Sequence, residues 1–244
     1  MFTTLIAVLF TLVLLLGVPV LSYSNTRNNE IQKIPRLSLY FSAVVSQWLL
    51  TGVGVGVVFL AARKVLVTGF AAMPLPAILE WGVGIAAASL AALGVVTWCE
   101  RRGWLPRESS LVYLLIPETR REKLWAALIV SPTAAFCEEF LFRGFLLTEF
   151  HDWLHSLLWA WVVSSAAFGL AHFYQGWSGM IRAGLLGALL AYPVVQWGNL
   201  YPAMLAHWMI DTVALLWLGS WMIGKEGPAV QSPKSEARDP DSQP

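Results

Sequence analysis

The chain is short of charged residues and of cysteines, and both shortages narrow the class of protein. Only 13% of its 244 residues are charged, against about 25% in a typical soluble domain, and its mean hydropathy is +0.62. Together with 57% hydrophobic residues and 13 tryptophans, this indicates a polytopic membrane protein. Two cysteines provide no disulfide framework and no CxxC pair, so we expect Cys99 and Cys137 to be small apolar packing residues. The net charge of +1, with no basic arm, gives no support for a nucleic-acid partner.

Long apolar runs recur along the chain. A helix that crosses a bilayer needs about 20 mostly apolar residues. Seven stretches are candidates: 2–22, 38–62, 77–98, 124–148, 156–173, 179–197 and 200–223. The first lacks a basic start and is longer than the apolar part of a signal peptide, so we interpret it as a retained helix. The predicted fold is all-α, a polytopic transmembrane helix bundle of about seven spans.

Polar segments divide the chain into three predicted parts. Residues 1–114 hold the N-terminal transmembrane helices and a basic loop, in which "SLVYLLI" is expected to form an interfacial helix. Residues 115–223 hold the remaining helices. Residues 224–244 are rich in Pro and Ser and are expected to be a disordered cytoplasmic tail.

The distribution of basic residues predicts the orientation in the membrane. Thirteen lysines and arginines fall on one side, in the first and third loops, at Arg182 and in the tail, whereas the other side has only Arg63 and Lys64. Since cytoplasmic loops carry the excess of basic residues, we expect a multi-pass protein with its N-terminus outside and its C-terminus in the cytoplasm.

Charged residues interrupt the fourth apolar run in "EEFLFR". Ionisable residues within a bilayer are costly and tend to face the bundle interior and to pair. Glu139 and Arg143 are four residues apart and share a helix face, so they can pair. Glu138 is rotated about 100° away and is left without that partner, which suits a general base. The alternative for Glu139 and Arg143 is a clamp that only fixes helix packing.

Two further sets of polar residues lie in later apolar runs. "FGLAH" ends the fifth run and places Phe168 one turn before His172. His172 alone also fits an interfacial residue, and Phe168 alone fits ordinary packing. In "HWMID", His207 and Asp211 are four residues apart on one face, which suits a self-satisfied pair, a shared cavity or a metal site.

Taken together, these sets predict a buried, hydrated pocket formed by Glu138, His172, His207 and Asp211. Such a group can activate water directly or hold a metal such as Zn²⁺ that does so. Counting from the predicted helix ends places Glu138 and His207 at similar depths, but it places His172 nearer the cytoplasmic end.

The motifs "EEFLFRG" (138–144), "FGLAH" (168–172) and "HWMID" (207–211) resemble the EExxxR, FxxxH and Hxxx(N/D) motifs of the CPBP family. These are CAAX-protease and bacteriocin-processing membrane proteins, and they include the Ras-converting type of prenyl-protein endopeptidase. The likeness covers about residues 115 to 215 and implies a CAAX-protease-like catalytic core.

The resemblance implies a role for each matched residue. Glu138 corresponds to the catalytic acid, which activates water with the help of His172, whereas His207 and Asp211 stabilise the oxyanion. Glu139, Arg143 and Phe168 support them. Asp211 stands where the prenyl-processing members have Asn, and Asp donates a hydrogen bond only when protonated, so a metal bound by Glu138, His172, His207 and Asp211 stays open.

The resemblance implies an intramembrane endopeptidase acting through water, on a membrane-associated peptide or protein that is prenylated at a CAAX-type end or is another kind of membrane peptide. Its partners are then the lipid bilayer and that substrate. Two alternatives remain: a non-enzymatic membrane protein for protection or partner binding, and a proton-coupled carrier. A carrier predicts broken helices in two matched halves, and the sequence shows no internal repeat. We expect Gly184 and Gly187 to allow close helix packing.

Overall fold

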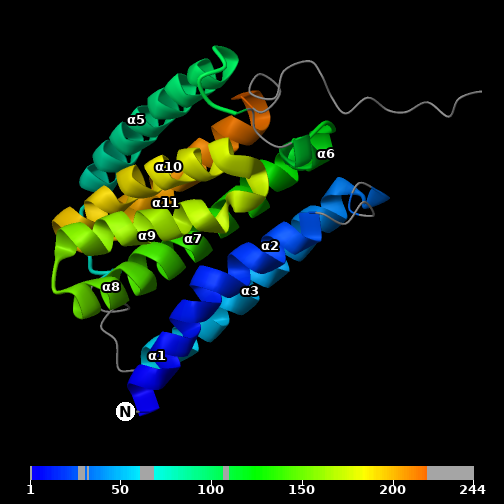
Figure 1. The fold of residues 1–244 in the computed structure, drawn as a ribbon. Helices are drawn as coiled ribbons and strands as arrows, with labels where there is room; N and C mark the ends of the chain where they lie inside the picture. The colour runs from blue at the N-terminus through cyan, green and yellow to red at the C-terminus, as the bar shows by residue number, and fades with distance from the viewer. Residues whose placement is uncertain (1, 27–30, 32, 61–68, 107–109, 219–244) are drawn as a thin grey trace, which may run out of the picture.

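The computed structural model describes residues 2–26, 31, 33–60, 69–106 and 110–218, and every element within them is a helix (Figure 1). The N-terminal helices are α1 (Phe2–Leu12), α2 (Val18–Thr26), α3 (Arg36–Leu60) and α5 (Leu75–Arg101). The later helices are α6 (Arg120–Trp125), α7 (Ser131–Glu138), α8 (Leu147–Leu154), α9 (Leu157–Ala171), α10 (Gly176–Trp197) and α11 (Tyr201–Val213). Short π-helical stretches continue α1 into α2, link α6, α7 and α8 into one long helix, and extend α11 to Leu218.

Seven helical segments lie at the seven predicted places, which confirms the all-α, membrane-spanning fold class. Five of them are long and apolar enough to cross a membrane within the described residues: Phe2–Ser24, Arg36–Leu60, Leu75–Arg101, Arg120–Leu154 and Phe173–Trp197. The fifth, α9, has only 15 residues, and the seventh reaches the edge of the described chain. The tail predicted over 224–244 lies outside the described residues.

The loop predicted to hold an interfacial helix contains a short 3₁₀ helix, Ser110–Leu115 (η3). The hydroxyl of Tyr40 in α3 donates to the Leu115 carbonyl at 2.7 Å and ties this loop to the bundle. A capping box of Thr119 and Glu122 then starts α6, because each side chain accepts a hydrogen bond from the backbone N–H of the other residue.

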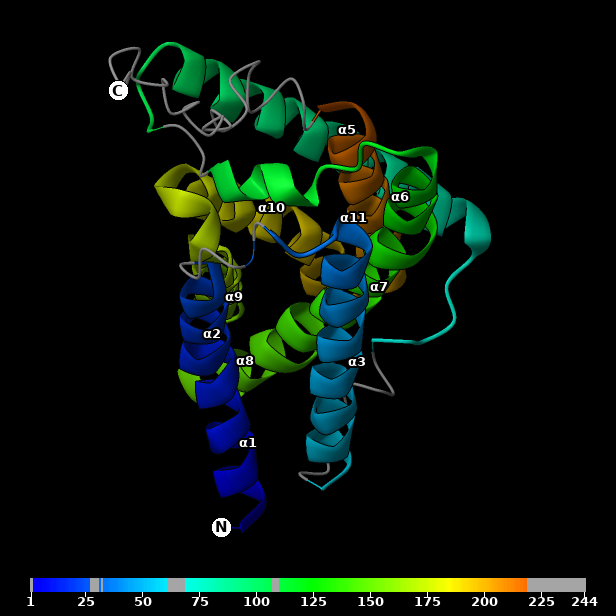
Figure 2. The same ribbon diagram turned by 90° about the vertical axis from the view of Figure 1, so that its right-hand side faces the viewer.

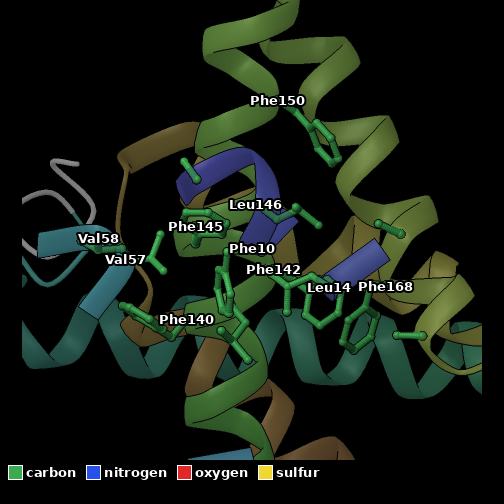
Figure 3. Packing of buried hydrophobic residues seen from close by; sticks show 14 of the residues in the cluster. Phe10, Leu14, Val57, Val58, Phe140, Phe142, Phe145, Leu146, Phe150 and Phe168 are labelled. Atoms are coloured by element: carbon green, nitrogen blue, oxygen red, sulfur yellow. The ribbon is translucent and has the colours of Figure 1, made fainter. Parts of the chain in front are cut away.

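The first helix and α3 stand side by side against the later helices (Figures 1 and 2). One hydrophobic cluster joins them to the core, as Figure 3 shows for Phe10 and Leu14 beside Phe142 and Phe145. The Phe10 and Phe145 rings meet edge to face with centroids 5.2 Å apart. The hydrophobic core therefore crosses the boundary predicted at residue 114, and the division into parts stays a prediction.

The outer surface of the bundle is apolar, as a lipid-facing surface should be. Large hydrophobic side chains on every long helix are exposed, including Phe41, Phe59, Val95, Leu128 and Trp159. A soluble protein rarely exposes so continuous an apolar surface, because water does not solvate it favourably. With the hydropathy of the helices, this surface identifies an integral, multi-pass membrane protein.

A helical hairpin brings the fourth and fifth helices back past each other. The long helix ends at Leu154, His155 adopts a left-handed conformation (φ 50°), and Ser156 caps the start of α9. Glu138 precedes Leu154 by 16 positions and His172 follows Leu157 by 15, so the hairpin places them at the same level. The low placement of His172 assumed that the fifth run crosses the whole membrane, whereas α9 has only 15 residues.

Helices α9 and α10 pack in close backbone contact, and Gly176 turns the chain from one helix into the other. After α9 ends, a 3₁₀ turn (Phe173–Gln175, η6) leads to Gly176, whose φ of 87° turns the chain into α10. At Gly169 an added Cβ would lie 2.7 Å from the Met180 carbonyl oxygen. A Cβ added at Gly187 would lie 3.3 Å from its nearest neighbour, and a Cβ added at Gly184 would lie 3.7 Å from its nearest neighbour. The close packing expected at Gly187 is present, and the tightest contact, at Gly169, was not predicted.

A buried ion pair joins α5 to α10. Arg182 is buried inside α10 and lies 3.3 Å from the carboxylate of Glu100, which also accepts a hydrogen bond from the Ser178 hydroxyl. Arg182 was counted with the loop residues for the orientation, and this assignment was wrong because Arg182 is a buried residue within α10.

Candidate active site

The Glu139–Arg143 pair lies in a π-helical stretch, Glu139–Leu146, at the centre of the molecule. Both side chains are buried, and Arg143 Nη1 donates to Glu139 Oε1 at 2.9 Å. A second guanidinium nitrogen donates to the Gly187 carbonyl of α10 at 3.3 Å. The pair therefore forms as its spacing indicated, and the absence of a side chain at Gly187 gives the guanidinium room to reach the backbone.

Phe168 packs against Arg143 and both imidazoles of this centre. The guanidinium carbon of Arg143 lies 4.0 Å from the centroid of the Phe168 ring, within the range of a cation–π contact. The same ring lies 4.6 Å from the His172 ring and meets the His207 ring edge-on at 6.1 Å. Phe168 thus sets the positions of Arg143 and of both imidazoles.

His172 is the residue at which α9 ends, and its ring is fixed from one side. Nδ1 lies 2.9 Å from the Phe168 carbonyl oxygen. A carbonyl only accepts hydrogen bonds, so Nδ1 carries a proton, and when the ring is neutral it presents the lone pair of Nε2. That nitrogen faces Glu138 Oε2 at 4.0 Å.

His207, from α11, is fixed in the same way by a carboxylate. Nδ1 lies 2.7 Å from Glu139 Oε1, so it donates to that oxygen. Nε2 faces Glu138 Oε2 at 3.9 Å and Asp211 Oδ2 at 3.6 Å. Glu139 therefore holds Arg143 and His207 at once, and both imidazoles direct Nε2 to one carboxylate oxygen.

Glu138 itself is partly buried and makes a contact that the sequence did not predict. The side-chain amide of Gln47 in α3 donates to Glu138 Oε1 at 2.8 Å. This leaves Oε2 free to face the two imidazoles. Gln47 is the one amide side chain in the apolar helix α3, and that isolation was the signal in the sequence.

A cavity of about 270 Å³ joins these groups. Its polar wall includes Gln47, Glu138, His172, Tyr174, His207 and Asp211. Its apolar wall comes from α5, α10 and α11, through Leu93, Leu186, Leu190 and Ile210. All four predicted residues thus line one cavity that has both an acid–imidazole end and an apolar surface.

The same side chains were also considered as a metal site. Within the part of the chain that the structure describes, no three His, Cys, Asp or Glu side chains are arranged to hold a metal ion. We therefore derive no step through a metal.

The fold and the site define a multi-pass membrane protein with a buried carboxylate and two imidazoles around a cavity. Residues 120–213 match the family model described as type II CAAX prenyl endopeptidase Rce1-like. This segment is therefore similar to the CAAX protease family, whose motifs the three sequence motifs resemble. The matched segment holds Glu138, His172, His207 and Asp211 and excludes Gln47. No curated protein and no solved structure matches the chain.

Proposed function

We propose that the protein is an intramembrane endopeptidase that hydrolyses a peptide bond in a membrane-associated substrate. The observation that carries this proposal is the convergence of His172 Nε2 and His207 Nε2 on Glu138 Oε2, at 4.0 and 3.9 Å, inside a cavity. The match of residues 120–213 to the family model supports a protease, and the finer choice of a prenylated CAAX-type end belongs to this proposal.

In the first step, Glu138 activates water. A distance of 4.0 Å is too long for a direct hydrogen bond between His172 and Glu138, and it suits two groups that share one water molecule. The Glu138 carboxylate takes a proton from that water, and His172 Nε2 orients it by accepting its second hydrogen. The hydroxide oxygen then bonds to the carbonyl carbon of the scissile peptide bond.

In the next step, the carbonyl oxygen becomes an oxyanion and needs donors. His207 in its imidazolium form donates from Nε2, and Asp211 donates when it is protonated. The C–N bond then breaks, and the proton held by Glu138 passes to the leaving amine. The products are a new carboxyl group and a new amino group, and Glu138 is a carboxylate again.

The proton-coupled carrier receives less support from the fold. That alternative predicts broken helices, whereas the glycine-rich run 179–193 lies within the uninterrupted helix α10, with Pro193 inside it. A non-enzymatic role predicts a cavity without a complete acid–imidazole set, whereas all four residues line this cavity.

The test is a comparison of peptide termini in membranes that contain wild type or Glu138→Gln at equal protein levels. The substitution keeps the shape of the side chain and removes the base. Glu80→Gln is the matched control, because Glu80 is an exposed glutamate of α5. We expect new carboxyl and amino termini with wild type and Glu80→Gln only. Identical termini in all three samples would overturn the proposal.

The cleaved bonds also decide the substrate class. Synthetic peptides that span them can be offered to the reconstituted protein with and without a prenyl group. Cleavage that needs the prenyl group supports the CAAX-type substrate, and equal cleavage of both peptides excludes that requirement.

A further inference from the structure

The family match begins at residue 120, yet the catalytic carboxylate of the proposed mechanism has a partner from the first part of the chain. Gln47 lies on the face of α3 that packs against α7. The stacking of Trp48 on Phe136, with ring centroids 5.3 Å apart, holds these helices together independently of Gln47. The amide therefore has a fixed distance to Glu138 without being needed to hold the helices together.

The hydrogen bond between Gln47 and Glu138 can be donated only by Gln47 when Glu138 is ionised. A carboxylate only accepts, so the Gln47 amide nitrogen donates to Oε1 at 2.8 Å. Within the described residues, no other hydrogen bond reaches the Glu138 carboxylate, which is 19% exposed. Among the described residues, Gln47 is therefore the hydrogen-bond partner that holds the carboxylate with Oε2 directed at the imidazoles.

The charges around Glu138 do not replace that contact. His172 at the end of α9 and His207 of α11 face Oε2 at about 4 Å. Asp211 faces His207, and Arg143 is engaged with Glu139 and Gly187. From α3, the described residue that meets Glu138 is the neutral Gln47.

We propose that Gln47 is a positioning residue, which holds Glu138 in its ionised form with Oε2 directed at the water shared with His172. A hydrogen bond to the charged form of an acid favours that form, and a rigid carboxylate favours the productive geometry. The site is then completed by α3, which no part of the family match includes. The kinetic consequence rests on the proposed function, whereas the effect on Glu138 ionisation does not.

The first readout needs no catalysis. A hydrophobic carbodiimide modifies protonated carboxyl groups, and fragment masses separate Glu138 from Glu139. Labelling of the reconstituted protein over a series of pH values gives the pH of half-labelling. In Gln47→Leu, about tenfold more Glu138 is protonated at a given pH, so half-labelling moves up by about one pH unit. Gln47→Met keeps the length of the side chain, loses the donor and moves the half-labelling pH the same way. Ser46→Ala, on the exposed face of α3, leaves it unchanged.

The second readout is the rate of peptide cleavage by the same samples. Gln47→Leu lowers kcat about 10- to 100-fold and leaves KM within about twofold, because misplacement affects the reacting atoms rather than substrate binding. If wild type cleaves and the half-labelling pH is the same in all variants, the role of Gln47 is wrong and the endopeptidase stands. If wild type cleaves no peptide and the half-labelling pH still moves in the Gln47 variants, the proposed endopeptidase function fails and the contact to Glu138 stands. If one Gln47 variant does not fold, the other gives the same decision.

Discussion

Both imidazoles of the cavity are anchored through Nδ1, one by a backbone carbonyl and one by the Glu139 carboxylate. Both anchors occupy Nδ1, so Nε2 is the nitrogen that faces the cavity in each ring. Glu139 and Glu138 are neighbours in the chain but have separate tasks. Glu139 positions Arg143 and His207, while Glu138 meets the cavity.

Asp211 gives a pH-dependent prediction at the residue scale. As an oxyanion donor it works only when protonated, so the rate should fall as pH rises through its titration. Asp211→Asn donates at every pH. We expect this variant to keep activity at neutral pH and to extend the alkaline limb of the kcat profile to higher pH.

The control for that profile is His207→Phe, which removes the other donor and should lower kcat about 10²- to 10³-fold at every pH. Loss of all activity in Asp211→Asn would contradict the donor role. It would show instead that the carboxylate itself is needed, as a metal ligand would be.

At the scale of elements, the sequence predicted the helices well and their ends poorly. Apolar runs of the right length located all seven helical segments. The fourth helix was predicted to end at 148 and runs on to Leu154, because Glu149 and Asp152 look like loop residues and Glu149 is buried. The motifs located four cavity residues, but Gln47 is 91 positions from Glu138, and no local pattern predicts a contact at that separation.

The α9–α10 contact supports a stability prediction. Ala at 169 places its Cβ 2.7 Å from a backbone oxygen, which cannot move aside as a flexible side chain can. We expect Gly169→Ala to destabilise the protein by about 1–3 kcal/mol and to lower its melting temperature in detergent. Gly184→Ala is the control at the same interface, because its nearest contact is an ordinary 3.7 Å. An equal loss in both variants would contradict this account of the packing.

The Glu100–Arg182 pair supports a second prediction about how elements are joined. Removing one partner of a buried pair leaves an uncompensated charge, so Arg182→Met should cost about 3–5 kcal/mol of unfolding free energy. The double variant Glu100→Leu, Arg182→Met should recover most of that loss. The matched comparison is the more exposed Arg36–Glu118 pair at 2.7 Å, where Arg36→Met should cost at most about 1 kcal/mol. Similar losses of unfolding free energy at the two pairs would contradict a stabilising role for the buried Glu100–Arg182 pair.

At the scale of the whole molecule, aromatic residues mark two levels along α5. Trp81 packs with Tyr192 and Trp197 near the start of that helix, and Trp98 packs with Trp104 near its end. Tryptophan and tyrosine favour the membrane–water interface. Trp81 and Trp98 are 17 positions apart, or about 26 Å along a helix, close to the thickness of a hydrocarbon core.

The orientation of the chain in the membrane is predicted from the distribution of its basic residues. We expect the C-terminus to lie in the cytoplasm, so a C-terminal fluorescent reporter that folds only there should be bright, and a reporter that needs export should be inactive. The control is the same pair of reporters placed after Leu60, which should give the reverse result. Activity of the exported reporter at the C-terminus would invert the predicted topology.

The central claim is that Glu138 activates water rather than attacking the peptide bond itself. A single turnover in H₂¹⁸O, with enzyme in excess over a peptide that spans a cleaved bond, separates these two mechanisms. We predict one ¹⁸O atom in the new carboxyl group of the product and none in Glu138, with the rate reduced about 10²- to 10⁴-fold in Glu138→Gln. A product without ¹⁸O, together with ¹⁸O in the Glu138 carboxylate, would contradict the account.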